Sequence, residues 1–154
     1  ENVLALWSLQ QMLSSLKNLE FKNTEVRKLR DHFETSIQNK ISGVTITARE
    51  SLRLSNTSSL VIQDVDGETL LMSLDLKGFA VSTGAACSSG NPEPSPVLLS
   101  MGLSREEAQS SLRVSLGWHT TIDEIDLFIS ALVEVVERIR KIKSESKEKN
   151  SHAG

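Results

Sequence analysis

The chain has 154 residues, with 17 Lys and Arg against 20 Asp and Glu, and it contains one cysteine. That length can bury one hydrophobic core, and 38% hydrophobic with 24% charged residues is typical of a folded globular protein. One cysteine excludes an internal disulfide and a zinc site made of several thiolates. A net charge of −3 argues against nucleic acid as a partner. No apolar run approaches the roughly 20 residues needed to cross a membrane.

Two amphipathic helices are predicted at the start of the chain. Apolar residues spaced three and four apart predict a helix over 2–17, and a second helix from an N-cap at Asn23 or Thr24 to Lys40. The charged residues of the second helix lie mostly off its apolar stripe, so we expect them on a solvated face. They are Arg27, Lys28, Arg30, Asp31 and Glu34.

Strands and a short helix are predicted next. The β-branched stretch 44–48 and the stretch 59–62 are typical of strands. Residues 66–78 predict a helix that ends in a cation and a glycine, and 79–82 predicts a third strand. Helices and strands joined by short links indicate a small α+β domain, with a mixed sheet packed against helices.

The stretch 82–96 interrupts this regularity. It holds all three prolines and two of the eight glycines, which predicts a loop, and helix resumes near Val97. Capping-box patterns predict helix starts at Ser104 and Thr121, and alternating apolar residues predict a strand over 112–116.

Three regions follow from this pass along the chain. They are a leading helix over 1–20, a domain over 21–143 that carries the loop at about 82–96, and a polar tail over 144–154 that we expect to be disordered.

Cys87 is the first candidate for chemistry, because it lies in the 82–96 loop among small residues. A free cysteine is often a small buried hydrophobe, whereas an accessible thiol can act as a nucleophile when its pKa is lowered. No adjacent Lys, Arg or His is present to lower it, so the residues alone leave both interpretations open.

Arg113 is the second candidate, on the short apolar strand 112–116. Its planar guanidinium suits a carboxylate, although an arginine on an exposed sheet face is the alternative. No metal-binding or phosphate-binding motif is present in the sequence.

Several motifs occur in a fixed order along the chain. Residues 74–90 read LDLKGFAVSTGAACSSG, Glu93-Pro94-Ser95 follows, and residues 111–117 read SLRVSLG. Together they closely resemble the cysteine desulfurases, pyridoxal-phosphate (PLP) enzymes related to class V aminotransferases. The resemblance extends from about residue 1 to about residue 140.

The resemblance implies a fold, a reaction and two site residues. The fold is the small C-terminal domain of a fold-type I PLP enzyme, whose parent class is α/β, and the leading helix enters from a large domain absent here. The reaction converts L-cysteine to L-alanine and a persulfide on Cys87, with Arg113 holding the substrate carboxylate. The persulfide sulfur would pass to an acceptor or scaffold protein, in iron–sulfur cluster assembly, from a full-length enzyme that is a homodimer. Separately from the resemblance, a reduced cysteine and the lack of a leader favour the cytoplasm.

Some family features are missing from the sequence. No lysine has the histidine-lysine setting of the Schiff-base lysine, and the glycine-rich phosphate segment is absent, so we expect no cofactor-binding or metal-binding residue in this chain. The chain is therefore expected to be part of a longer enzyme and inactive alone. Ser59 also replaces the second asparagine of the family pattern that begins at Arg53, so no role of that asparagine carries over.

Other functions stay open at this point. A non-catalytic interaction module could accept persulfide or act in redox chemistry through Cys87. A selenocysteine lyase or another class V aminotransferase would share the same motifs, because substrate choice depends mostly on contacts outside this chain.

Overall fold

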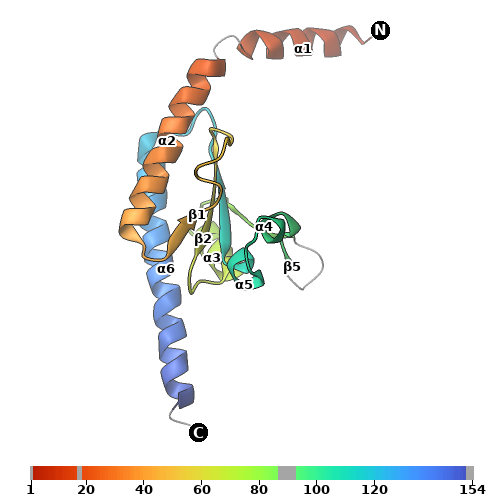
Figure 1. Cartoon of the computed structure of the whole chain (residues 1–154). Coiled ribbons are helices and arrows are strands. Elements are labelled where there is room, and N and C mark those ends of the chain that lie inside the picture. The colour runs from red at the N-terminus through yellow and green to blue at the C-terminus, as the bar shows by residue number, and fades with distance from the viewer. Residues whose placement is uncertain (1, 17–18, 87–92, 152–154) are drawn as a thin grey trace.

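The computed structural model describes residues 2–16, 19–86 and 93–151, and its centre is a four-stranded antiparallel sheet (Figure 1). The helices are α1 (Val3–Ser15), α2 (Leu19–Lys40), α3 (Gly67–Asp75), α4 (Pro96–Ser100), α5 (Arg105–Gln109) and α6 (Ile122–Ser151). The strands are β1 (Val44–Ile46), β2 (Thr57–Ile62), β3 (Ser82–Thr83), β4 (Ala85–Ala86), β5 (Glu93–Pro94) and β6 (Ser111–Ser115). The α+β prediction is confirmed.

The sheet has the order β1-β2-β6-β3, and its register separates two faces. Leu60 of β2 lies opposite Leu112 of β6, and both side chains are fully buried toward the helices. Ser59 lies opposite Arg113, one residue along each strand, and therefore faces the other way. This alternation puts an apolar face under the long helices and a polar face on the opposite side.

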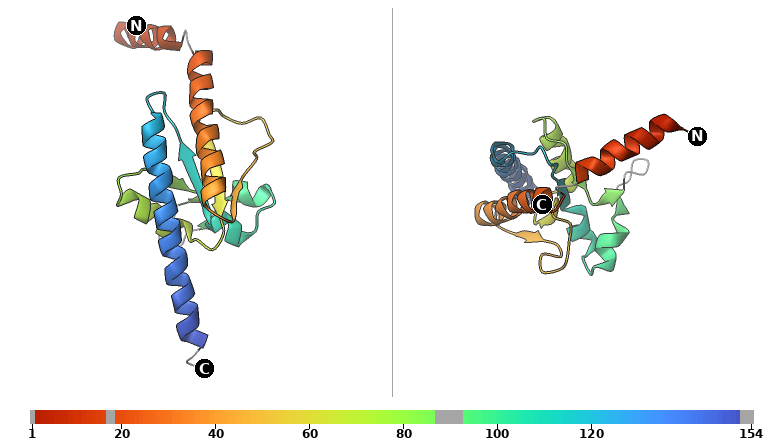
Figure 2. Two further views of the ribbon diagram at one scale, coloured as in Figure 1. Left: turned by 90° about the vertical axis from the view of Figure 1, so that its left-hand side faces the viewer. Right: turned by 90° about the horizontal axis from the view of Figure 1, so that it is seen from above.

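The core lies between the sheet and helices α2, α3 and α6, which cover the same face (Figure 2). Phe33 of α2 is fully buried, and its ring centroid lies 5.5 Å from that of Phe128 on α6. The short helices α4 and α5 lie on the other side of the sheet, as Figure 1 shows. Most of the buried apolar side chains form one continuous cluster, which is the main core of the described chain.

Helix α2 departs from the sequence prediction at its start. It begins at Leu19 rather than at a cap near Asn23 or Thr24, because the Thr24 hydroxyl donates to the Glu20 carbonyl within the helix instead of capping it. The predicted solvated face is wrong for Arg30 and Glu34, which are both buried. Glu34 is the fourth residue after Arg30, so both side chains lie along one side of the helix, where they meet the chain between β1 and β2.

The segment before and within the predicted loop also differs. Residues 79–81 are not in a strand, because pairing with β6 begins only at Ser82. The 82–96 stretch contains β3, β4 and β5, and the last two pair with each other in a separate two-stranded sheet. Small residues and prolines therefore fold here into short paired strands on either side of 87–92, residues that lie outside the described part of the chain.

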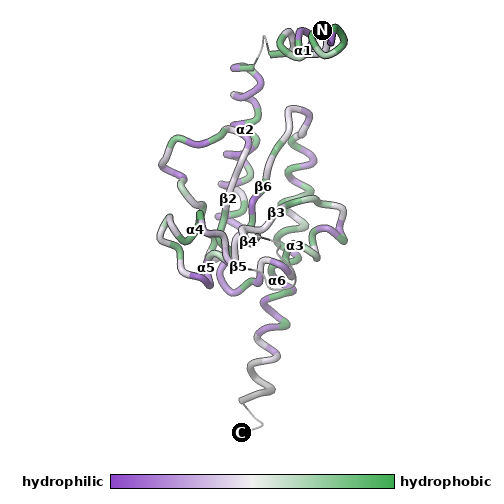
Figure 3. Tube along the Cα trace, turned by 90° about the vertical axis from the view of Figure 1, so that its right-hand side faces the viewer, coloured by the Kyte–Doolittle hydropathy of each residue, from purple (hydrophilic) through white to green (hydrophobic). Residues whose placement is uncertain are grey.

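The two terminal helices project from this domain (Figure 2). Figure 3 shows that α1 is largely apolar, and Leu6 and Trp7 are both more than half exposed. Helix α6 starts with the predicted capping box at Thr121 and continues through residues 144–151, where the sequence predicts a polar tail. Extending an existing helix costs little, since nucleation is already complete. None of the helices in the described ranges is long and apolar enough to span a membrane.

Candidate functional site

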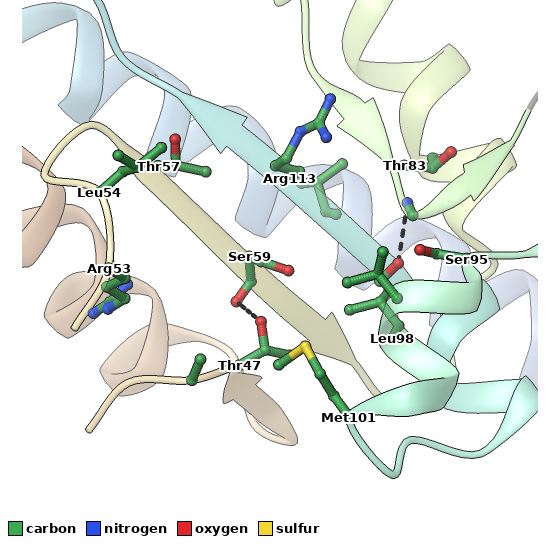
Figure 4. A pocket seen from close by; sticks show the side chains of 15 residues that line it. Thr47, Arg53, Leu54, Thr57, Ser59, Thr83, Ser95, Leu98, Met101 and Arg113 are labelled. Carbon is green, nitrogen blue, oxygen red and sulfur yellow. Dashed lines mark hydrogen bonds between the residues drawn. The ribbon is translucent and has the colours of Figure 1, made fainter. Parts of the chain in front are cut away.

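A cavity of about 470 Å³ lies on the polar face of the sheet, away from α2 and α6 (Figure 4). Strands β2 and β6 form its floor, the segment after β1 forms one wall, and α4 forms the other. The Thr47 hydroxyl donates to the Ser59 carbonyl at 3.0 Å and so ties the first wall to the floor. The site is therefore built mainly by secondary structure.

Arg113 stands on the cavity floor because its strand alternates. Its neighbours Leu112 and Val114 are buried on the helix side, so the arginine side chain emerges on the opposite face. It is flanked across the sheet by Ser59 on β2 and Ser82 on β3. Within the described residues Arg113 makes no hydrogen bond or ion pair, and no carboxylate lines the cavity. The guanidinium thus has no partner among the described residues, and its binding of a carboxylate stays a prediction.

A second arginine of the cavity, Arg53, is already paired. Its guanidinium donates to both carboxylate oxygens of Glu34 at 2.6 and 2.7 Å, and the Ser58 hydroxyl donates to the same carboxylate at 2.7 Å. The Glu34 side chain is 2% exposed and that of Arg53 is 17% exposed. This network fixes the segment between β1 and β2 to helix α2, and it leaves Arg113 as the unpaired cation of the described cavity lining.

The charges of this network shift both pKa values. Burial by itself raises the pKa of Glu34, but the hydrogen bonds from Arg53 and Ser58, together with the charges of Arg53 and Arg30, outweigh it and hold that pKa below the usual 4.5. The hydrogen bonds to Glu34 likewise raise the pKa of Arg53. Both groups are therefore charged around neutral pH, and the pair behaves as a fixed structural ion pair.

Cys87 lies outside the described residues, so its position relative to Arg113 stays a prediction. The described chain on both sides of 87–92 does reach the cavity, because Gly84 and Ser95 line it together with Arg113. Strands β4 and β5 pair Ala85 with Pro94 and Ala86 with Glu93, which holds the two ends of this segment together.

Comparison with known proteins gives the family. The model of the class-V aminotransferase family matches residues 1–128 of the chain. The chain belongs to that family. A cysteine desulfurase of Azotobacter chroococcum is 34% identical over 136 residues, 88% of this chain and 34% of the relative. The cysteine desulfurase IscS of Dictyoglomus turgidum is 38% identical over 115 residues, 75% of this chain and 29% of the relative.

A solved structure supports the same family. The crystal structure of a NifS-like protein from Rickettsia africae superposes with a TM-score of 0.68 at 31% identity, over 78% of this chain and 30% of that protein. The class-V aminotransferase chain thus spans about a third of the length of the curated relatives it matches. The predicted family is confirmed.

The cavity of this class-V aminotransferase chain does not fit PLP by itself. Such a cofactor is held through a lysine amine and a phosphate site, and the described cavity lining contains no lysine. Its only cationic side chains are Arg53, which is paired with Glu34, and Arg113. The described residues therefore supply no anchor for the cofactor.

Sequence reasoning missed the network beneath the cavity. Its signal is the spacing of Val26, Arg30, Phe33, Glu34 and Ile37, all buried in α2 at steps of three, four and one. That spacing is typical of the core-facing side of a helix. Because Arg30 and Glu34 are charged, the sequence suggested a solvated side instead. The partner Arg53 is 19 residues from Glu34 in sequence, and no local pattern connects the two.

Proposed function

We propose that this chain carries the carboxylate-binding arginine and the sulfur-accepting cysteine of a cysteine desulfurase. The supporting observation is the unpaired Arg113 on the floor of a cavity that Gly84 and Ser95, on either side of 87–92, also line. An arginine with a free planar fork, in a cavity whose described lining has no carboxylate, is suited to bind the α-carboxylate of an amino acid. Cys87 lies three residues after Gly84 in sequence, which would bring its thiol to the same cavity.

The proposed reaction moves one sulfur atom. The Cys87 thiolate attacks the sulfur of L-cysteine, the bond between that sulfur and the substrate Cβ breaks, and a sulfur–sulfur bond forms. The electron pair of the broken bond stays with the substrate carbon, which takes a proton to become L-alanine. Cys87 is left as a persulfide, and the thiolate form is required because the thiol is a poor nucleophile.

The groups that make this cleavage possible are not among the described residues. We propose that PLP would be held by the part of the longer relatives that this chain does not span, and that it would stabilise the electron pair left on the substrate carbon. We also propose that an acceptor or scaffold protein takes the sulfur, that the working enzyme is a homodimer, and that it acts in the cytoplasm, where thiols stay reduced.

Thiol–disulfide exchange offers a direct test in the chain itself, because Cys87 is its single cysteine. The disulfide of 3-mercaptopropionate presents a sulfur two carbons from a carboxylate, the same separation as in cysteine, and the corresponding bis-amide is its neutral match. Exchange joins one half of the probe to Cys87 and releases the other half as a thiolate.

We expect Arg113 to favour the carboxylate probe. The quantity to measure is the rate of the acid probe divided by that of the amide probe, which cancels the intrinsic reactivity of Cys87. Arg113→Gln should lower this ratio about five-fold, the equivalent of roughly 1 kcal/mol for a solvent-accessible ion pair. Arg27→Gln, an exposed arginine on α2, is the matched control and should leave the ratio unchanged. Equal ratios for Arg113→Gln and the unmodified chain would remove the basis for this function.

A second assay separates catalysis from acceptance of sulfur. The chain mixed with PLP and L-cysteine should release no alanine, since the described lining of its cavity contains no lysine. Release of alanine from that mixture would contradict the division of labour proposed here. Persulfide that forms on Cys87 only when a complete desulfurase is added would favour the non-catalytic acceptor module.

A further inference from the structure

The chain leaves the main sheet at Gly84, where the backbone N–H bonds to a side chain instead of to the neighbouring strand. Strand β3 pairs with β6 through Ser82 opposite Arg113 and Thr83 opposite Leu112, which brings Gly84 next to Ser111. The Gly84 N–H does not continue the ladder but donates to the Ser111 hydroxyl oxygen at 3.1 Å, as the dashed line in Figure 4 shows. One residue later, β4 begins in the second sheet.

Ser111 is also held in place by helix α5. Its side chain is buried, with the residue 1% exposed, and its hydroxyl donates to the Ala108 carbonyl at 2.7 Å. The Ser111 hydroxyl thus donates one hydrogen bond to α5 and accepts one from Gly84. Loss of the hydroxyl would leave a buried carbonyl and a partly buried N–H without these partners.

Gly84 is also closely enclosed by side chains of β6 and α4. A Cβ atom at this residue would overlap the Ser111 hydroxyl oxygen and would lie 2.5 Å from the Leu98 Cδ1 of α4. Leu98 is buried, so it has little room to move. Glycine is therefore required here for a close approach, and the backbone at residue 84 is held between β6 and α4.

We propose that Ser111 is a positioning residue, whose hydroxyl holds the backbone at Gly84 at a fixed place relative to Arg113. Ser111 and Arg113 lie on the same face of β6, two residues apart, so the anchor and the carboxylate site belong to one rigid strand. The segment that carries Cys87 then starts from a fixed point beside the substrate carboxylate. This inference rests on the proposed function, and it assigns the anchor to a residue outside the reacting groups.

Amide hydrogen exchange in the unmodified chain tests the anchor first. The Gly84 N–H should exchange slowly although it lies outside the backbone ladders, because it is bonded to a buried hydroxyl. Ser111→Ala should speed the exchange of Gly84 about ten-fold while the amides of Leu60 and Leu112 keep their rates. Free exchange of Gly84 in the unmodified chain, or equal acceleration of all three amides in the variant, would overturn the proposal.

The ratio of the acid and amide disulfide probes then tests whether the anchor serves the site. Ser111→Ala should lower this ratio toward the value of Arg113→Gln, because the starting point of the segment is no longer held beside the arginine. Ser115→Ala is the matched control, since Ser115 lies on the same strand and the same face but is exposed. A ratio in Ser111→Ala equal to that of the unmodified chain would overturn the positioning role. If Arg113→Gln leaves the ratio unchanged, the proposed function fails instead, and the exchange result alone decides the anchor.

Discussion

The sharpest prediction concerns the buried ion pair beneath the cavity. Arg53→Met removes the two hydrogen bonds of 2.6 and 2.7 Å that satisfy the Glu34 carboxylate. At about 4 Å between charge centres and an effective dielectric constant of about 20, the lost attraction is about 4 kcal/mol. Breaking a buried pair typically costs about 3–5 kcal/mol, because a charge stays buried without its partner. We place this case near 3 kcal/mol, since Arg53 is 17% exposed and the charge of Arg30 remains nearby.

Substitution of the other partner, Glu34→Gln, should lower the free energy of unfolding by less. In Glu34→Gln the amide oxygen can still accept from Arg53 or Ser58, and Arg53 can turn toward water in the cavity that it lines. We expect a loss of about 1–2 kcal/mol, near that of an ordinary hydrogen bond. Replacing Glu34, Arg53 and Ser58 together by Leu, Met and Ala should lose less than Arg53→Met alone, because no polar group of the network then stays buried and unpaired.

Urea unfolding followed by circular dichroism measures these differences. A loss of about 3 kcal/mol lowers the midpoint by about 2 M urea if the slope is about 1.5 kcal/mol per molar. Arg27→Met, an exposed arginine of the same helix, is the control and should change stability by less than about 0.5 kcal/mol. An Arg53→Met midpoint no lower than that of Glu34→Gln would refute the assignment of a buried, Arg53-dependent carboxylate.

The same pair makes a prediction about pH with a definite sign. The folded chain holds the pKa of Glu34 below its usual 4.5, so below that pH the unfolded chain binds more protons than the folded one. The stability that Glu34 contributes is thus fully present above pH 4.5 and is lost as the pH falls through the lower folded value. The stability difference between the unmodified chain and Glu34→Gln should shrink over that acidic range, and a difference independent of pH would contradict it.

Four further substitutions test packing and exposure. Gly67→Ala should lower the free energy of unfolding by about 1–3 kcal/mol, because its Cβ would overlap the Gln109 carbonyl oxygen. Gly117→Ala is the control and should have little effect, since the nearest atom to its Cβ would be 3.8 Å away. Equal losses in the two variants would count against the close approach at Gly67. Phe33→Ala should lose about 3–5 kcal/mol because the ring is fully buried, and a loss under 1 kcal/mol would place it outside the core. Arg113→Gln should change the free energy of unfolding by less than about 0.5 kcal/mol, because the exposed guanidinium has no partner in the described chain.

Local pattern predicted the parts of the fold that depend on near neighbours in sequence. The capping box at Thr121 and the apolar stripe after it identify α6, and the alternation around Arg113 identifies β6 and the face that bears the arginine. The motif around Cys87 also pointed to the family before any comparison. The signals for α6 and β6 are periodic, so the backbone period alone is enough to interpret them, whereas the motif around Cys87 indicates the family only by resemblance.

Only the tertiary structure decided which polar groups meet. Glu34 lies in a helix that the sequence assigns to solvent on its charged side, and its burial depends on Arg53, 19 residues away. The contact of Gly84 with Ser111 spans 27 residues and joins a strand end to a neighbouring strand. A buried polar group is stable only when its partner is placed against it, and that placement follows from how the sheet and helices pack rather than from the period of any one segment.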